Sequence, residues 1–184
     1  MAESYRALHI DSLSLHRNLW LGRVFYWSGR YDEAIAQCYR TLDLDGNSPL
    51  AHEGLGDAYE QQGQYAEAIA AWSRAIVLRG KGELAALVEH TFAASGFDAA
   101  VRVLALRRLE RLNEKKERGA YVPAMAFVTL YLRLGDREQT TAWLARAVLE
   151  RNRMVLGIAI DPRYESLRSD PQFVSLARQM GFTQ

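Results

Sequence analysis

The sequence repeats itself at an interval of 34 residues, and this period constrains the fold more than any other feature. Residues 21–25 (Leu-Gly-Arg-Val-Phe) correspond to residues 55–59 (Leu-Gly-Asp-Ala-Tyr), and residues 29–35 correspond to residues 63–69 without a gap. Periods of roughly 20 to 50 residues are typical of solenoids, in which one unit cannot bury its apolar face alone and must stack on its neighbours. The period therefore predicts an array of small stacked units.

Each unit has the pattern of two helices joined by a short turn. The first helix combines a large apolar residue, a small one and an aromatic one, as in Leu55, Gly56 and Tyr59. The small residue lets the second helix come close, and Gly63 ends the first helix, because glycine adopts the left-handed conformation without strain. The second helix has a buried stripe at helical spacing, formed by Ala68, Ile69, Trp72, Ala75 and Ile76.

This pattern resembles the tetratricopeptide repeat, a helix–turn–helix unit with a period of 34 residues. The resemblance is strong over residues 15–80 and looser over residues 82–113. It returns over residues 122–152, where the aromatic, glycine and small positions are taken by Tyr131, Gly135 and Ala147. The resemblance implies an all-α fold, a right-handed α-solenoid of antiparallel helix pairs.

The first residues align with the end of a second helix. Tyr5 corresponds to Tyr39 and Ile10 to Leu44, again 34 residues apart. We therefore expect the chain to be a piece of a longer protein whose preceding repeat is truncated. The expected division is a tail of that repeat at 1–14, repeats at 15–48 and 49–81, degenerate repeats at 82–120 and 121–153, and a C-terminal cap at 154–184.

The C-terminal region contains two aspartate–proline pairs, Asp161-Pro162 and Asp170-Pro171. Aspartate is a favoured N-cap and proline is favoured at the first helical position, so two short helices are predicted. Their apolar residues are expected to face the last repeat and to close the solenoid; these are Tyr164, Leu167, Phe173, Leu176, Ala177 and Met180.

The same tail is similar to the close of repeat regions in bacterial multidomain proteins. The shared features are Asp-Pro-Arg followed by an aromatic residue, then Leu-Arg-Ser-Asp-Pro, then Phe, with Gly-Phe at the end. In such proteins the repeats follow a winged-helix DNA-binding domain, a Ser/Thr kinase domain or a cyclase domain. The resemblance implies the C-terminal interaction module of a bacterial regulator, for example of transcription.

The sequence has no pattern that predicts catalysis, a metal site or a cofactor. It lacks a phosphate-binding glycine loop, a His-Glu-x-x-His motif and a Gly-x-Ser-x-Gly motif. Cys38 occupies the core position that Trp72 has in the next repeat, so a buried, unreactive thiol is expected. The four histidines lie at different phases of the repeat. We therefore expect no enzyme activity, no metal and no cofactor.

Charge and hydropathy restrict the partners further. The net charge is +1, and the basic run at 107–118 also contains Glu110, Glu114 and Glu117. Nucleic-acid binding requires a clustered basic face, so no nucleic acid is expected to contact this chain. No apolar run approaches the length that spans a bilayer, and no membrane contact is expected. The expected compartment is the cytoplasm, or the periplasm if the parent protein spans a membrane.

The predicted function is that of a non-catalytic module that binds a protein or peptide in a concave groove. The first helices of the repeats line that side of a solenoid. The candidate binding residues at these positions are Trp20, Arg23, Tyr26, Trp27, Glu53, Asp57, Glu60, Thr129 and Arg133. Trp20, Arg23 and Trp27 are the strongest candidates, because tryptophan and arginine dominate binding energy at interfaces.

Two alternatives remain at this stage. The module is a homotypic assembly surface, or it is an accessory arm that positions a substrate for a fused enzyme. The aromatic residues near Trp20 also suit packing against the truncated repeat, and in that case the exposed face favours a homodimer. A carboxylate clamp of the kind found in tetratricopeptide co-chaperones is not expected. Of its groove positions, only Arg23 is basic; the others hold Leu19, Gly54, Glu83 and Leu87.

Overall fold

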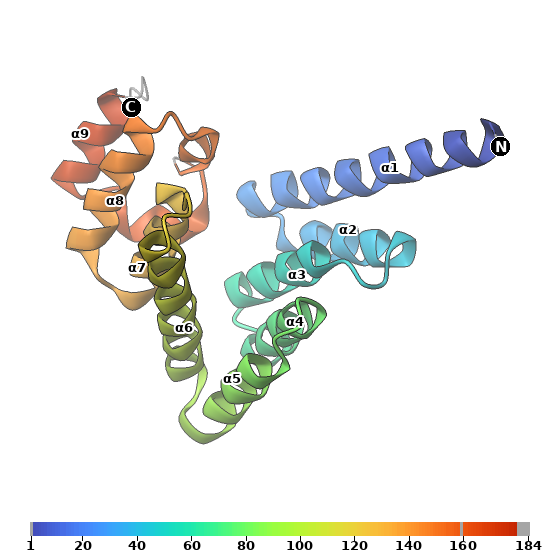
Figure 1. The fold of residues 1–184 in the computed structure, drawn as a ribbon, viewed down its shortest axis with the longest axis horizontal. Helices are drawn as coiled ribbons and strands as arrows, with labels where there is room; N and C mark the ends of the chain where they lie inside the picture. Colours follow the sequence, from blue (N-terminus) through green and yellow to red (C-terminus); the bar gives the residue numbers. More distant parts are fainter. Residues whose placement is uncertain (1, 159, 180–184) are drawn as a thin grey trace. The chain divides into compact units, whose positions relative to one another are not determined.

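The computed structural model describes residues 2–158 and 160–179, and in that part of the chain the regular elements are all helical (Figure 1). The chain divides into two compact units, Met1–Ala100 (unit 1) and Val101–Gln184 (unit 2). Consecutive helices pack against one another within each unit. The predicted all-α solenoid of helix pairs is confirmed as the fold class.

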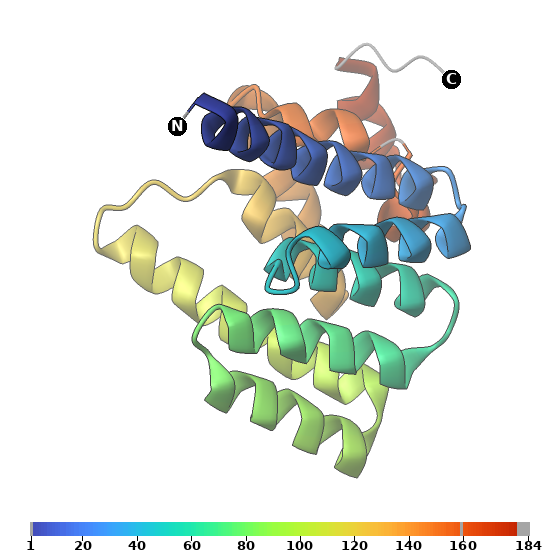
Figure 2. The same ribbon diagram turned by 90° about the vertical axis from the view of Figure 1, so that its right-hand side faces the viewer.

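Unit 1 is a stack of antiparallel helices (Figures 1 and 2). Its elements are α1 (Ala2–Trp27), α2 (Tyr31–Leu44), α3 (Pro49–Gln61), α4 (Tyr65–Leu78), α5 (Gly82–Ser95) and the beginning of α6 (Phe97–Glu117). Each of the helices α1 to α4 packs on the next one, and α1 also contacts α3. The first helices of successive repeats therefore lie side by side, as the 34-residue period predicts.

The turns inside the two repeats are the same. Gly29 and Gly63 have positive φ angles of 72° and 73°. The amide of the following residue closes each helix by donating to the carbonyl of the residue five positions earlier. These bonds are Arg30 N to Phe25 O at 2.9 Å and Gln64 N to Tyr59 O at 2.9 Å. Since these are the bonds of a Schellman motif, the predicted glycine stops are confirmed.

Small residues in the first helices leave room for large side chains of the second helices. Gly56 on α3 lies directly against the indole of Trp72 on α4. Trp72 is buried, and its Nε1 donates to Asp57 at a distance of 3.2 Å. The predicted stripe on α4 is buried throughout, which fixes the face of α4 that meets α3.

The expected boundary near residue 14 has no counterpart in the backbone. Helix α1 continues for 26 residues, from Ala2 to Trp27, so the tail of the expected preceding repeat and the first helix of repeat 1 form one helix. The reason is visible in the sequence, because neither proline nor glycine occurs between residues 2 and 21. Helix α6, which lies in the expected third repeat, is also long. It has 21 residues, whereas α2 and α4 have 14 each.

Unit 2 contains the rest of α6, the helix pair α7 (Ala124–Leu134) and α8 (Arg137–Leu149), and a C-terminal segment. That segment comprises two 3₁₀ helices, η1 (Arg153–Gly157) and η2 (Pro162–Leu167), and α9 (Pro171–Gln179). Helix α7 packs on α8, and α8 also contacts η1 and α9. Gly135 (φ 74°) ends α7 in the left-handed conformation, and Asp136 N donates to Tyr131 O at 3.0 Å. The same kind of glycine turn is thus present in unit 2.

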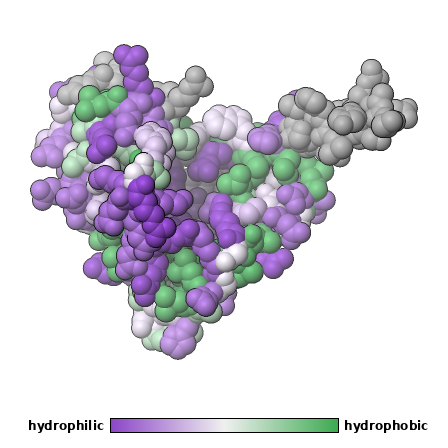
Figure 3. Space-filling model, viewed as in Figure 1, coloured by the Kyte–Doolittle hydropathy of each residue, from purple (hydrophilic) through white to green (hydrophobic). Residues whose placement is uncertain are grey.

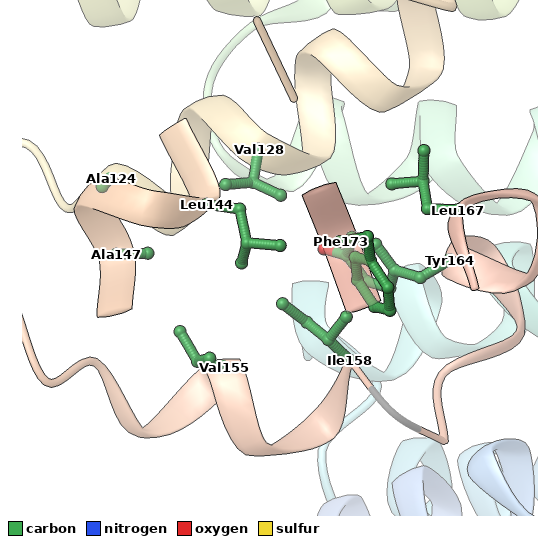
Figure 4. Close-up of a cluster of buried hydrophobic side chains, with 9 residues drawn as sticks. All are labelled: Ala124, Val128, Leu144, Ala147, Val155, Ile158, Tyr164, Leu167 and Phe173. Carbon is green, nitrogen blue, oxygen red and sulfur yellow. The ribbon is translucent and has the colours of Figure 1, made fainter. Parts of the chain in front are cut away.

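The C-terminal segment forms one core with α7 and α8. Figure 4 shows its side chains pointing toward Val128 of α7 and Leu144 of α8. The buried residues from the segment are Val155, Ile158, Tyr164, Leu167 and Phe173, and Leu176 packs against them. The prediction that these apolar residues face the last helix pair agrees with this arrangement. The side chain of Ala177 and the whole of Met180 lie outside the described residues.

Both aspartates cap their helices as predicted. Asp161 Oδ1 accepts from Arg163 N at 3.0 Å at the start of η2. Asp170 Oδ1 accepts from Gln172 N at 2.8 Å and from Phe173 N at 3.3 Å at the start of α9. Local hydrogen bonds therefore fix the starts of η2 and α9, the helices that contain the buried Tyr164 and Phe173.

Candidate protein-binding surface

Trp20, Arg23 and Trp27 lie on one face of α1, because residues three, four and seven apart share a side of a helix. The rings of Trp20 and Trp27 meet edge to face, with 5.8 Å between their centroids. The Arg23 guanidinium lies over the Trp27 ring at 5.8 Å from its centroid. We name these three residues the α1 aromatic surface.

The α1 aromatic surface is open to solvent. Trp20 is 63% exposed, whereas Arg23 and Trp27 are half-buried. An exposed tryptophan is unfavourable in water, and indole and guanidinium groups provide most of the energy at protein interfaces. The arrangement therefore has the chemistry of a contact surface for another macromolecule.

Tyr26 is in the core, which corrects its place among the predicted binding residues. It is 4% exposed and packs with Ala34 of α2 and Ala58 of α3. Its ring lies 5.9 Å from that of Tyr31, centroid to centroid. The side chain points from α1 between α2 and α3, so it holds the repeats together and does not reach a partner on the surface.

Two of the predicted acidic residues of α3, Glu53 and Asp57, have partners within unit 1. Glu53 forms a two-pronged ion pair with Arg79, at 2.5 and 2.9 Å. Asp57 accepts the hydrogen bond from Trp72, and Glu60 is half-buried. Glu53 and Asp57 thus contribute to the packing of α3 on α4. Figure 3 shows apolar side chains over α2 and α3 on one face of this unit.

The two predicted residues of unit 2 lie beside the C-terminal segment. The Thr129 hydroxyl is 3.4 Å from the Tyr164 hydroxyl, and Met125 and Leu132 of the same helix pack against the buried cluster. Arg133 is half-buried. The segment therefore covers part of the α7 face that the repeat pattern assigned to a groove. Seven of the nine predicted residues belong to unit 1 and two to unit 2.

Cys38 lies between the first helices of the two repeats. A Cβ at Gly54 would be 2.8 Å from Cys38 Sγ, and one at Gly22 would be 3.7 Å away. Burial raises the pKa of the thiol to about 12; the charge of Asp57 adds to the increase and that of Arg23 opposes it. The structure thus agrees with a buried, unreactive thiol.

Several contacts could not be inferred from the repeat. The buried side chain of Gln37 on α2 donates to Asn18 Oδ1 on α1. Leu21 and Val24 on α1 are 38% and 37% exposed. The 34-residue pattern predicts neither the Gln37–Asn18 hydrogen bond nor the exposure of Leu21 and Val24. The pattern shows which positions share a helix face, but it does not show which residues pack against α1.

Neither metal ligation nor membrane crossing has a structural basis in the part of the chain described. In residues 2–158 and 160–179 no three His, Cys, Asp or Glu side chains come together as they do around an ion. Over the same residues, no helix has the length and apolar character needed to pass through a membrane.

The fold and the surface define a class of protein: stacked helix pairs that present an aromatic and cationic patch. Comparison with protein families finds the tetratricopeptide repeat over residues 12–76. Such repeats generally mediate protein–protein interaction and are not catalytic scaffolds. Curated proteins and solved structures provide no match. The matched residues include the whole of the first repeat with the clear 34-residue period, 15–48, and most of the second, 49–81.

Proposed function

We propose that this chain is a non-catalytic module that binds a protein or peptide partner through the α1 aromatic surface. The observation that carries the proposal is the exposed indole of Trp20, which packs edge to face against the Trp27 ring. The Arg23 guanidinium lies over that same Trp27 ring. Side chains that are already ordered lose little conformational entropy on binding, which favours affinity. The match of residues 12–76 to a family of interaction repeats supports the same function.

A cross-linking experiment followed by a binding measurement tests this function. A photoreactive phenylalanine analogue at position 20 is expected to cross-link the partner in cells, whereas the same analogue at Tyr39, an exposed residue of α2, is not. The cross-linked protein is then purified and titrated against the full chain. Trp20→Ala with Trp27→Ala is expected to weaken binding at least about tenfold.

The control for this titration is Tyr39→Ala, which removes an aromatic ring from another exposed site. It is expected to leave the affinity within about twofold, and all variants are expected to keep the helical circular dichroism spectrum. Unchanged affinity in the double tryptophan variant would remove the α1 aromatic surface from the binding site.

A second candidate function is homotypic assembly through α1. Leu21 and Val24 are more than one-third exposed on the same helix as Trp20, which gives α1 an apolar surface that a second copy can cover. Sedimentation equilibrium over a wide concentration range tests it. Dimer formation that is lost in Trp20→Glu supports assembly, and a monomer at all concentrations contradicts it.

We also propose that the chain is the C-terminal part of a larger bacterial regulatory protein in the cytoplasm. The support is the resemblance of the tail, from Asp161 through the final Gly-Phe, to the end of the repeat regions of such proteins. The complete reading frame is the test. A winged-helix, kinase or cyclase domain encoded upstream supports this context, and a frame without one contradicts it.

A further inference from the structure

Charge is divided unevenly between the two units. Unit 1 contains 8 Lys and Arg and 13 Asp and Glu, whereas unit 2 contains 15 and 9, so their formal net charges are −5 and +6. A concentration of one sign of charge attracts ligands of the opposite sign and speeds their association. Unit 2 therefore favours an acidic ligand, although the net charge of the whole chain is near zero.

Two of these cations converge on one tryptophan. The Trp143 ring of α8 is stacked on Phe127 of α7, with 4.0 Å between centroids and 14° between planes. Lys116 Nζ and Arg146 Cζ lie over the same indole, 5.0 and 5.4 Å from its centroid. The Trp143 ring thus contacts Phe127 of α7 as well as both cations. We name Lys116, Trp143 and Arg146 the Trp143 cluster.

The neighbouring carboxylate neutralises only part of this cluster, since Glu150 forms an ion pair with Arg146 alone. Glu150 Oε1 is 3.4 Å from Arg146 Nε, while its Oε2 accepts from Ala124 N at 2.9 Å and from the Tyr121 hydroxyl at 3.3 Å. The Oε2 atom of Glu150 is thus bonded at the beginning of α7. In the described part of the chain, Lys116 contacts the indole and forms no ion pair. With one carboxylate beside two cations, the cluster keeps a net positive charge that attracts an anion.

Apolar side chains border the cluster. Tyr121 is 76% exposed although its hydroxyl is bonded to Glu150, and Leu149, three residues after Arg146, is also strongly exposed. A peptide that carries carboxylates beside an apolar residue matches both the charge and these neighbours. Nucleic acid is the poorer match, because Glu110, Glu114 and Glu117 interrupt the basic residues of α6 and phosphate binding needs a continuous basic face.

We propose that the Trp143 cluster is a second binding site, for an acidic peptide segment of a protein partner. The carboxylates of the peptide pair with Lys116 and Arg146, and the half-buried Trp143 ring holds both cations near each other. The site belongs to unit 2 and does not depend on the α1 aromatic surface. Changes at Trp20 and Trp27 therefore test one site and changes at Lys116 and Arg146 test the other.

The test is a fluorescence anisotropy titration of the full chain with a labelled octaglutamate peptide. We expect saturable binding that weakens as salt is raised from about 50 to about 200 mM, because salt screens exposed charges. Lys116→Glu with Arg146→Glu is expected to weaken binding at least about tenfold. Lys116→Gln with Arg146→Gln removes the charges without reversing them and is expected to cause a smaller loss.

The matched control is Arg102→Glu with Arg107→Glu. It makes the same change in net charge at two exposed positions of α6 that are earlier in the helix. This control is expected to stay within about threefold of the wild type, which is the effect of net charge alone. Equal losses in the control and in the cluster variants would overturn the proposal, as would the absence of peptide binding.

Two other outcomes would overturn the proposal of an acidic peptide, because each would identify a different ligand of the Trp143 cluster. If single-stranded oligothymidylate binds more tightly than octaglutamate and loses binding in the same cluster variants, the ligand is nucleic acid. If the chain forms dimers at low salt that Lys116→Glu with Arg146→Glu converts to monomers, the occupant is the acidic unit 1 of a second copy. Each variant must have a melting temperature, measured by circular dichroism, within a few degrees of that of the wild type.

Discussion

At the scale of single residues, the packing of the second repeat depends on the absence of a side chain at Gly56. An ideal Cβ there would lie 2.3 Å from Trp72 Cδ1 and Nε1, far inside van der Waals contact. Trp72 is itself fixed by burial and by its hydrogen bond to Asp57. The repeated Leu-Gly pair in the sequence is thus explained by contact between α3 and α4.

Gly56→Ala is expected to destabilise unit 1 by about 2 kcal/mol, because the methyl group must displace a buried indole. This cost exceeds the gain of roughly 1 kcal/mol that alanine brings to a helix. Gly82→Ala is the matched control, since Gly82 is helical and its Cβ would meet open space. Urea denaturation measures both, and an equal stability of the two variants would contradict the packing described for Gly56.

The chemistry of Cys38 follows from its burial. The ordinary pKa of 9.0 is raised to about 12 in the folded chain, chiefly by desolvation. Between these values the unfolded thiol has lost its proton and the folded one has kept it, so unfolding releases protons. The contribution of Cys38 to stability is complete below pH 9 and falls as the pH rises toward 12.

Alkylation by iodoacetamide at pH 9 is expected to be at least about a hundredfold slower in the native chain than in urea, because only the thiolate reacts and the native site is closed. Urea denaturation of wild type and Cys38→Ala at pH 8 and 10.5 checks the linkage. The wild type is expected to lose more stability than the variant over this interval. Similar alkylation rates in the native and unfolded chains would show that the thiol is accessible.

At the scale of elements, the C-terminal segment contains two aspartate caps that differ in burial. Asp161 is 3% exposed, caps η2, and also forms an ion pair with Arg163 at 2.6 Å. Asp170 caps α9 and forms only backbone hydrogen bonds in the described structure. The sequence gives both the same Asp-Pro motif, and the tertiary structure gives them unequal surroundings.

Asp161→Ala is expected to destabilise unit 2 by about 3 kcal/mol, because it leaves the Arg163 charge without its carboxylate in a largely buried place. Asp170→Ala is expected to cost about 1 kcal/mol, the usual effect of losing an N-cap. Thermal unfolding followed by circular dichroism compares the two. A larger loss for Asp170→Ala would show that the ion pair of Asp161 does not contribute as described.

At the scale of the whole molecule, the chain consists of two compact units, each with its own buried core. In repeat arrays, stability is close to a sum of contributions from each repeat and from its contacts with adjacent repeats. Local destabilisation is therefore expected to remain largely in the unit where it is introduced.

Hydrogen exchange followed by mass spectrometry tests this independence. Gly56→Ala is expected to lower amide protection in α2 to α4 and to leave α7 and α8 nearly unchanged, whereas Asp161→Ala is expected to do the reverse. An equal loss of protection in both units from either variant would show that the chain unfolds as a single cooperative body.

The local interactions of this fold were predictable from the sequence. The 34-residue period, the glycine stops at Gly29 and Gly63, the notch at Gly56 and the two Asp-Pro caps all depend on residues close together in the chain or on a repeated phase. Helix periodicity and capping require no knowledge of distant contacts. Much of the fold, and the position of the α1 aromatic surface on one helix face, follows from them.

The tertiary structure alone decided which of the candidate residues are available to a partner. Tyr26 is at a position that the repeat pattern assigns to the groove, but it packs against Ala34 and Ala58 in the core. Thr129 lies beside Tyr164, 35 residues away. The Trp143 cluster likewise joins α6 to α8. Burial and charge pairing arise from contacts between residues distant in sequence, and a repeat pattern contains no information about them.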